Sequence, residues 1–149
     1  MGALRGKVAI AGIGEVPTGR FPDEGAISFA LKSARMAIQN AGISKDDIDC
    51  VLPTAALYNS QFNTELVTCR LVEELGLRNV RKNVQIFSGG SSSSCALQIA
   101  GSLINSGQAT NVLFVHADKL GTGVTAQGGI DLFSTAGISM EWEVPFGQH

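Results

Sequence analysis

The residues best suited to chemistry form a Gly/Ser-rich turn, Ser88–Ser94, between a short apolar run and a helical pattern. The first turn of a helix presents N–H groups and a partial positive charge, which suits an anion, an oxyanion or a thiolate. Gly89 and Gly90 allow a ligand to approach the backbone, while the hydroxyls of Ser91 and Ser92 and nearby amides can hold a carbonyl or thioester oxygen. The alternative interpretation is a helix start of small residues that packs tightly against another chain, and both interpretations can hold together.

Cys95 is the nucleophilic side chain nearest to this turn. A helix N-terminus favours the thiolate form of a cysteine, but the apolar neighbours Ala96 and Leu97 are equally typical of a buried, unreactive thiol. Cys50 and Cys69 are interpreted as core thiols. Three cysteines with wide spacing and no Cys-x-x-Cys pair argue against a disulfide framework or a zinc site, and favour a reducing cytoplasm.

Three other features carry weaker signals. His116 follows an apolar run at a predicted strand end, where α/β folds place functional residues, although a structural histidine is the commoner case. Trp142 is interpreted as a packing anchor, with the lining of a substrate tunnel as the alternative. The segment Ala11–Pro17 begins like a dinucleotide fingerprint but has Pro17 where the third glycine belongs, so we interpret its glycines as a turn. The sequence contains no complete catalytic constellation and predicts no metal site.

Strand and helix patterns alternate along the chain. The apolar runs predict strands at Lys7–Ile13, Ile48–Leu52, Val84–Phe87 and Val112–Val115. Helical spacing predicts helices over Ala26–Ala41, from Asn63 or Thr64 onward, and over Ser92–Asn105, with glycines at 42, 76 and 107 as their ends. This order predicts an α/β fold with a mostly parallel sheet and helices on both faces. We expect residues 1–119 to form this domain, because residues 120–149 show no strong period.

Composition excludes several classes of protein. Among 149 residues, 44% are hydrophobic and 16% are charged, which is incompatible with a disordered chain. A net charge of −2 gives no electrostatic case for a nucleic-acid binder. No apolar run reaches the roughly 18 residues of a membrane span. The first residues have neither a signal-peptide pattern nor the Ser/Thr of a myristoylation site, so we expect a cytoplasmic location.

The turn and the elements around it resemble the core helix and first half of the thiolase superfamily, enzymes that make or break carbon–carbon bonds in acyl-CoA thioesters. The similarity is greatest to the sterol-carrier-protein type and its thiolase-like lyase relatives. The segments that carry it are Lys7–Gly14, Asn40–Ile43, Asp46–Asp49, Ser106–Ala109 with the strand after it, and Glu143–Gly147. The resemblance implies one half of a thiolase-type layered sandwich, the N-terminal half, with residues 120–149 as the start of the family's loop region. It also implies that the core helix is among the most buried elements and that a half-sandwich leaves one of its faces uncovered.

One family residue is missing from this helix. Thiolases carry a nucleophilic cysteine in Cys-x-Ser-Gly at its start, and counting back from Gly107 puts that position at Gly90. If the helix already runs from Gly90, Cys95 lies about 140° around the axis and about 7–8 Å along it, too far to replace that nucleophile. We therefore expect Cys95 to be a buried core thiol. The family's Gly-x-His and second Cys motif have no counterpart here, and thiolase-like lyases that act by retro-aldol chemistry show a similarly altered site.

The resemblance implies a coenzyme A thioester as substrate, carbon–carbon bond formation or cleavage by an acyltransferase or a retro-aldol lyase, and no cofactor. The implied substrate-binding residues are Gly89, Gly90, Ser91 and Ser92, with His116 as a further candidate. The implied partners are a second copy, through Val84–Phe87, and either a C-terminal half or an oligonucleotide-fold, zinc-ribbon protein. Alone, the chain is expected to be inert. The alternatives are a non-catalytic scaffold or binding subunit of a complex, and an unrelated α/β anion binder, for which the sequence offers no independent phosphate site.

Overall fold

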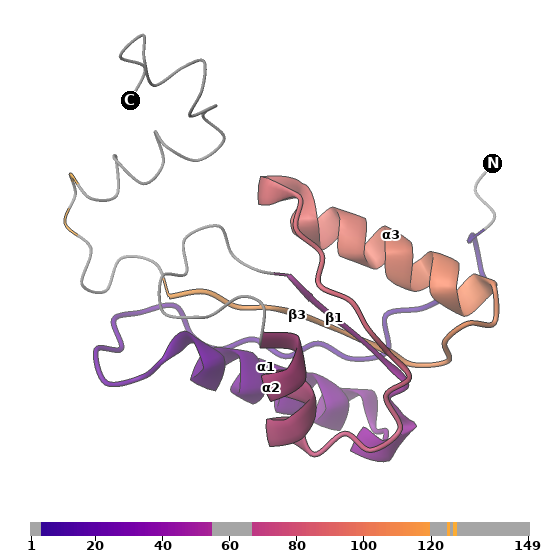
Figure 1. Ribbon diagram of the computed structural model, residues 1–149, viewed down its shortest axis with the longest axis horizontal. Helices are drawn as coiled ribbons and strands as arrows, with labels where there is room; N and C mark the ends of the chain where they lie inside the picture. Colours follow the sequence, from indigo (N-terminus) through magenta and orange to yellow (C-terminus); the bar gives the residue numbers. More distant parts are fainter. Residues whose placement is uncertain (1–3, 55–66, 120–124, 126, 128–149) are drawn as a thin grey trace, which may run out of the picture.

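The computed structural model describes residues 4–54, 67–119, 125 and 127. A parallel sheet lies between α3 on one face and α1 with α2 on the other (Figure 1). The helices are α1 (Ala26–Ala41), α2 (Val67–Leu75) and α3 (Ser92–Asn105), and the strands are β1 (Cys50–Thr54), β2 (Lys82–Asn83) and β3 (Val112–His116). Two 3₁₀ turns, η1 (Lys45–Asp47) and η2 (Gly89–Ser91), precede β1 and α3. The predicted α/β class, with a parallel sheet and helices on both faces, is confirmed.

The sheet has the order β2-β1-β3, so β1 is its central strand in the described part of the chain. Cys50, Val51 and Leu52 have no exposed surface. A strand that is covered on both faces needs a continuous apolar run rather than an alternating one, which is the pattern that predicted it. The structure begins this strand two residues later than predicted, because Ile48 is still the C-terminal cap of η1.

Alternate residues of the strands face opposite helices. Val51, Leu113 and Val115 belong to the core cluster that α1 and α2 cover. Cys50 and Leu52 belong to the cluster that α3 covers, where Ala96 and Ala100 let the helix backbone approach the sheet. The residues that α1 and α2 contribute to the first cluster are Ala30, Leu31, Ala34, Leu71 and Leu75.

At the amino ends of the strands a single carboxylate joins two elements. Asp49 accepts hydrogen bonds from the backbone N–H of Thr110, at 2.8 and 3.1 Å, and from that of Asn111, at 3.1 Å. Lys82 donates to the carbonyl oxygen of Gln108 at 2.8 Å in the same region. These bonds hold the loop before β3 against the starts of the other two strands.

The predicted strand at Val84–Phe87 contributes only an isolated bridge between Ile86 and Thr54. The N–H groups of Val84 and Ile86 still donate to β1, at 3.1 and 2.9 Å, but one of the acceptors is the carbonyl of Pro53. A proline has no N–H to return to the neighbouring strand, so the regular ladder of β2 stops at Asn83. The prediction was right about the position of this segment and wrong about its regularity.

The predicted strand at Lys7–Ile13 is wrong: the structure assigns no strand there. Ile10 and Ile13 are each 71% exposed, unlike residues of a doubly covered strand. The N–H of Ile13 donates to the side chain of Asn40, near the end of α1, at 2.9 Å. The segment therefore runs against α1 instead of joining the sheet.

Gly12 and Gly14 explain that placement. A Cβ atom added to Gly12 would lie 2.3 Å from the carbonyl oxygen of Ala37, and one added to Gly14 would lie 2.0 Å from that of Ser33. Both contacts are to the backbone of α1, which cannot move aside as a flexible side chain can. The glycines are therefore required for close packing on a helix, and the earlier interpretation of them as a simple turn is incomplete.

The predicted bounds of α1 and α3 are confirmed. The predicted helix ends are also confirmed, since Gly42, Gly76 and Gly107 have φ of 68°, 65° and 70°, a backbone conformation that glycine adopts freely. The predicted cap at Asn63 or Thr64 lies outside the described residues, as do Trp142 and all of residues 120–149 except 125 and 127. The proposed boundary at residue 119 therefore stays a prediction.

The prediction that α3 is among the most buried elements is wrong for this chain. Its buried residues are Ser92, Ala96, Ala100 and Gly101, which lie on the side that packs on the sheet or on the N-terminal segment. On other sides Leu97 is 47% exposed and Ile99 is 37% exposed. The expectation that a half-sandwich leaves one face of this helix uncovered is confirmed (Figure 1).

Gly14→Ala should lower the free energy of unfolding by about 1–3 kcal/mol, because its methyl group would overlap the backbone of α1. Gly90→Ala is the matched control, since a Cβ there meets no atom within 4 Å. Urea denaturation followed by circular dichroism measures both variants. Equal stability of the two variants would show that the N-terminal segment does not pack on α1.

Candidate functional site

The candidate site lies at the carboxyl end of the sheet. β1 ends at Thr54 and β3 ends at His116, and these two residues are partners in the parallel register. Thr54 also forms the bridge to Ile86, from which the chain passes through η2 into α3. The N-terminus of α3 therefore lies at the same end of the sheet as the carboxyl ends of the strands (Figure 1). Ligands of open α/β sheets bind at this edge.

The side chains of Thr54 and His116 also lie on the face of the sheet that α3 covers. Side chains alternate along a strand, so Thr54 lies on the same side as Cys50 and Leu52. By the same rule His116 lies on the side of Val112 and Phe114, and all four apolar residues belong to or pack on the cluster beneath α3. The structure thus brings His116 to the face and the end of the sheet where the predicted Gly/Ser turn begins.

The turn itself is a 3₁₀ turn, Gly89–Ser91, followed by the α-helix from Ser92. Gly89 has φ of 53°, a conformation that requires glycine in practice. A Cβ added to Gly90 meets no atom within 4 Å, so open space lies beside the position that the resemblance assigns to the nucleophile. The α-helix does not run from Gly90, which was the assumption behind the predicted offset of Cys95.

The serine hydroxyls stabilise this turn. The hydroxyl of Ser92, which is 1% exposed, accepts from the N–H of Ser88 at 2.8 Å and donates to the carbonyl of Gly89 at 2.7 Å. The hydroxyl of Ser91 donates to the carbonyl of Ser88 at 2.7 Å. Within the described ranges the N–H groups of Gly89 and Gly90 have no hydrogen-bond partner. Backbone donors, rather than the hydroxyl of Ser92, are therefore the groups open to a ligand.

Thr54 lies at this site but was not among the residues predicted for it. Its hydroxyl lies 2.6 Å from Nδ1 of His116 and 3.5 Å from the carbonyl oxygen of Val115, and the residue is 5% exposed. The available signal was a hydroxylic residue at the end of a fully apolar strand. The strand partner, 62 residues away, is visible only in the fold.

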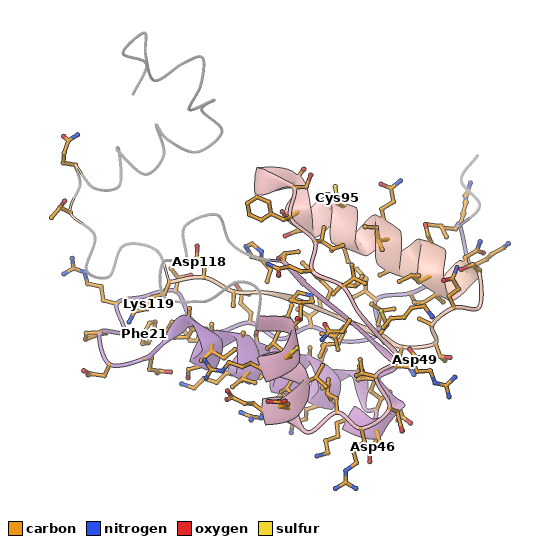
Figure 2. All side chains as sticks on the ribbon, in the orientation of Figure 1. Phe21, Asp46, Asp49, Cys95, Asp118 and Lys119 are labelled. Atoms are coloured by element: carbon orange, nitrogen blue, oxygen red, sulfur yellow. The ribbon has the colours of Figure 1, made fainter. Side chains whose placement is uncertain are left out.

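Asp118, two residues beyond β3, was also missed (Figure 2). Burial raises the pKa of its carboxyl group, against a hydrogen bond from the N–H of Lys119 at 2.7 Å and the nearby His116, which both lower it. Lys119 in turn donates to the backbone carbonyls of Pro22 and Glu24 before α1. These contacts tie the end of β3 to the loop in front of α1.

The three cysteines differ from their predictions in different ways. Cys50 is fully buried, as predicted, and burial raises the pKa of its thiol, with the nearby Asp49 as a second cause. Cys69 is exposed, because it lies two residues before the buried Leu71 and so about 200° around α2. Cys95 is only half-buried, with Sγ 3.9 Å from the hydroxyl of Ser91, so its prediction as a buried core thiol is wrong (Figure 2).

Within residues 4–54, 67–119, 125 and 127, every helix is too short or too polar to span a lipid bilayer. No group of three or more His, Cys, Asp or Glu side chains in these ranges is arranged to hold a metal ion.

Iodoacetamide should alkylate the folded protein first at Cys69, more slowly at Cys95, and at Cys50 only after unfolding. Exposure sets this order, and the raised pKa of Cys50 keeps that thiol protonated. Peptide mass spectrometry at timed intervals measures each rate, with a urea-unfolded sample as the control in which all three react. Fastest alkylation at Cys95, blocked by acetyl-CoA, would contradict this order and identify a reactive nucleophile.

No protein-family model matches the chain, but several known proteins are similar to it in sequence. The chain is 37% identical over 97 residues to beta-ketoacyl-[acyl-carrier-protein] synthase III of Sulfurovum sp. (strain NBC37-1), a match that covers 65% of this chain and 28% of that protein. It is 39% identical over 92 residues to the synthase III of Campylobacter fetus, covering 62% and 27%. The chain therefore spans less than a third of the length of the curated relatives it matches.

Solved structures share the fold. The 3-oxoacyl-[acyl-carrier-protein] synthase III of Aquifex aeolicus VF5 matches with a TM-score of 0.59 and 29% identity, over 69% of this chain and 32% of that one. A structure described as the Ltp2-ChsH2(DUF35) aldolase matches with a TM-score of 0.70 and 23% identity, over 95% and 34%. The acetyl-CoA acetyltransferase of Syntrophomonas wolfei matches with a TM-score of 0.62 and 22% identity, over 70% and 27%. The last two likenesses concern the fold alone.

These matches agree with the geometry. The relatives are condensing and thiolase-like enzymes, and each aligns with this chain over about a third of its own length or less. The parallel sheet between helices is the arrangement that the resemblance predicted. The chain thus has a thiolase-like fold and corresponds to one part of it.

Proposed function

We propose that this chain is the thioester-binding part of a thiolase-like enzyme that makes or breaks a carbon–carbon bond in an acyl-CoA. The observation that carries the proposal is the turn before α3, where open space at Gly90 lies beside the unpartnered N–H groups of Gly89 and Gly90. His116 ends a strand on the same face and at the same end of the sheet. Together these groups suit a thioester carbonyl oxygen that gains negative charge during reaction.

The chemistry follows from the donors. A thioester oxygen bound at the turn would accept hydrogen bonds from backbone N–H groups that the fold holds in place, and the dipole of α3 adds a favourable field. In a retro-aldol cleavage a base removes the proton of the β-hydroxyl group, and the resulting alkoxide oxygen forms a C=O bond at Cβ as the Cα–Cβ bond breaks. An aldehyde or ketone leaves, the electron pair of the broken bond forms the thioester enolate, and a proton then adds to Cα. The turn would stabilise that enolate oxygen. The reverse sequence of the same steps is an aldol addition.

Gly90 favours such a direct route over one with an acyl-cysteine. An enzyme that forms an acyl intermediate needs a nucleophile in the site, and Gly90 supplies none. Cys95 is half-buried one helical turn into α3 and contacts Ser91. We therefore assign no nucleophilic role to Cys95.

The remaining catalytic groups would come from outside the described residues, either from further chain or from a partner subunit. Leu97 and Ile99 are exposed on different sides of α3, and these apolar side chains support a body that covers the helix. One structural neighbour is described as an aldolase of Ltp2 with ChsH2(DUF35), which supports a partner subunit for this chain as well. The missing nucleophile at Gly90 equally favours a second candidate function, a non-catalytic binding subunit of a thiolase-like complex.

A titration of the ¹⁵N-labelled chain with acetyl-CoA tests the binding proposal. The amide signals of Gly89, Gly90 and Ser91 should shift, because the thioester oxygen would bind at these N–H groups. Gly90→Leu should abolish the shifts by filling the open space, whereas Gly90→Ala, with only a methyl group there, should largely retain them. Free coenzyme A is the control without a thioester. Absence of shifts at the turn at saturating acetyl-CoA, or identical shifts with free coenzyme A, would contradict the proposal.

We also propose a homodimer through the segment beside β2. Val84 and Phe87 are 50% and 63% exposed at the β2 edge of the described sheet, and large apolar side chains at a strand edge favour association. Sedimentation velocity should give a dimer that Val84→Lys dissociates at least tenfold more readily. Met36→Lys, at a 45% exposed position on α1, is the matched control. A monomer at all concentrations, or an equal effect of both variants, would contradict this interface.

A further inference from the structure

The contacts of the Thr54 hydroxyl favour one direction for its hydrogen bond with His116. The hydroxyl of Thr54 has one proton and two acceptors within reach: Nδ1 of His116 at 2.6 Å and the carbonyl of Val115 at 3.5 Å. If Nδ1 carried the ring proton, it would donate to the hydroxyl, and the hydroxyl proton would have only the carbonyl of Val115 as acceptor. A separation of 3.5 Å is too long for a strong bond. The hydroxyl proton therefore belongs on the side of Nδ1.

Burial strengthens this assignment. Thr54 is only 5% exposed, so bulk water cannot replace His116 as the hydrogen-bond partner of its hydroxyl. Loss of this bond would leave a buried hydroxyl without a partner, which costs free energy. The position of Thr54 is set by the register with β3, in which it pairs directly with His116. The histidine is itself exposed at the strand end, so its second ring nitrogen remains open to a ligand.

We propose that Thr54 is a positioning residue that fixes neutral His116 in the tautomer with its proton on Nε2. A hydrogen bond to one ring nitrogen determines which form the other nitrogen takes. His116 then presents an N–H donor at the carboxyl end of the sheet instead of an unprotonated nitrogen. As a neutral donor it acts on a carbonyl oxygen as an electrophile and does not act as a general base.

The role of His116 as a donor to a substrate oxygen rests on the proposed function, because it requires a thioester bound at this end of the sheet. The backbone N–H groups of Gly89 and Gly90 and the Nε2–H of His116 would then all be donors at the carboxyl end of the sheet. The base that removes a substrate proton must accordingly come from another group. The tautomer itself is independent of any substrate.

Ring ¹⁵N chemical shifts of the neutral histidine test the tautomer directly in the ligand-free chain. His116→Gln assigns the signals, because the sequence contains only one other histidine, His149. The wild-type chain and Thr54→Ser should show the proton on Nε2, whereas Thr54→Val, which keeps the shape and removes the hydroxyl, should show a mixture of both forms. A proton on Nδ1 in the wild-type chain would overturn the proposal even if Thr54→Val did not fold. An unchanged tautomer in a folded Thr54→Val chain would overturn it as well.

Binding separates this inference from the proposed function. In the acetyl-CoA titration, Thr54→Val should weaken binding roughly tenfold and Thr54→Ser by less than about threefold. If acetyl-CoA does not bind while the Nε2 tautomer is found, the proposed function fails and the positioning role of Thr54 stands. If acetyl-CoA binds at the turn and the Nδ1 tautomer is found, the proposed function stands and this inference fails.

Discussion

The burial of β1 on both faces is the constraint on which the rest of the structure depends. Cys50, Val51 and Leu52 are fully covered, which requires helices on two sides and a strand on each edge. A strand surrounded in this way has only its ends left for contact with solvent. Because all described strands are parallel, their carboxyl ends meet at a single edge, and the chain that leaves β2 must begin α3 there. The position of the Gly/Ser turn is thus a consequence of the sheet.

Elements with local signals could be predicted from the sequence. The bounds of α1 and α3 follow from helical spacing and from glycines with positive φ just beyond their ends, and these signals need no knowledge of the rest of the chain. The strand predicted at Lys7–Ile13 was wrong for the opposite reason. An apolar run with two glycines is compatible with a buried strand and with a segment packed on a helix, and only the contacts of Gly12 and Gly14 with α1 distinguish them. The prediction for Cys69 failed because it followed from the apolar neighbours and not from the position around α2, about 200° from the buried Leu71.

In the candidate site, too, some residues could be predicted from the sequence and others could not. The turn around Gly90 has a local signature of glycines and hydroxyls, and the sequence alone indicated both its helix start and its small side chains. The pair of Thr54 and His116 has no local signature in the sequence. The two residues are 62 positions apart, and the register between β1 and β3 brings their side chains together. Pro53 is a related case: its missing N–H ends the ladder with β2, an effect that depends on which neighbour its backbone faces.

The carboxylate of Asp49 lies at the other end of the same strands. By holding the N–H groups of Thr110 and Asn111, it secures the loop before β3 at the amino edge, while Thr54 and His116 lie at the carboxyl edge. The groups that hold the framework and the groups available for chemistry are therefore separated by the length of a strand. Substitutions at the carboxyl edge can then alter reactivity without breaking the hydrogen bonds of Asp49. The fold can therefore acquire new chemistry at that edge with little loss of stability.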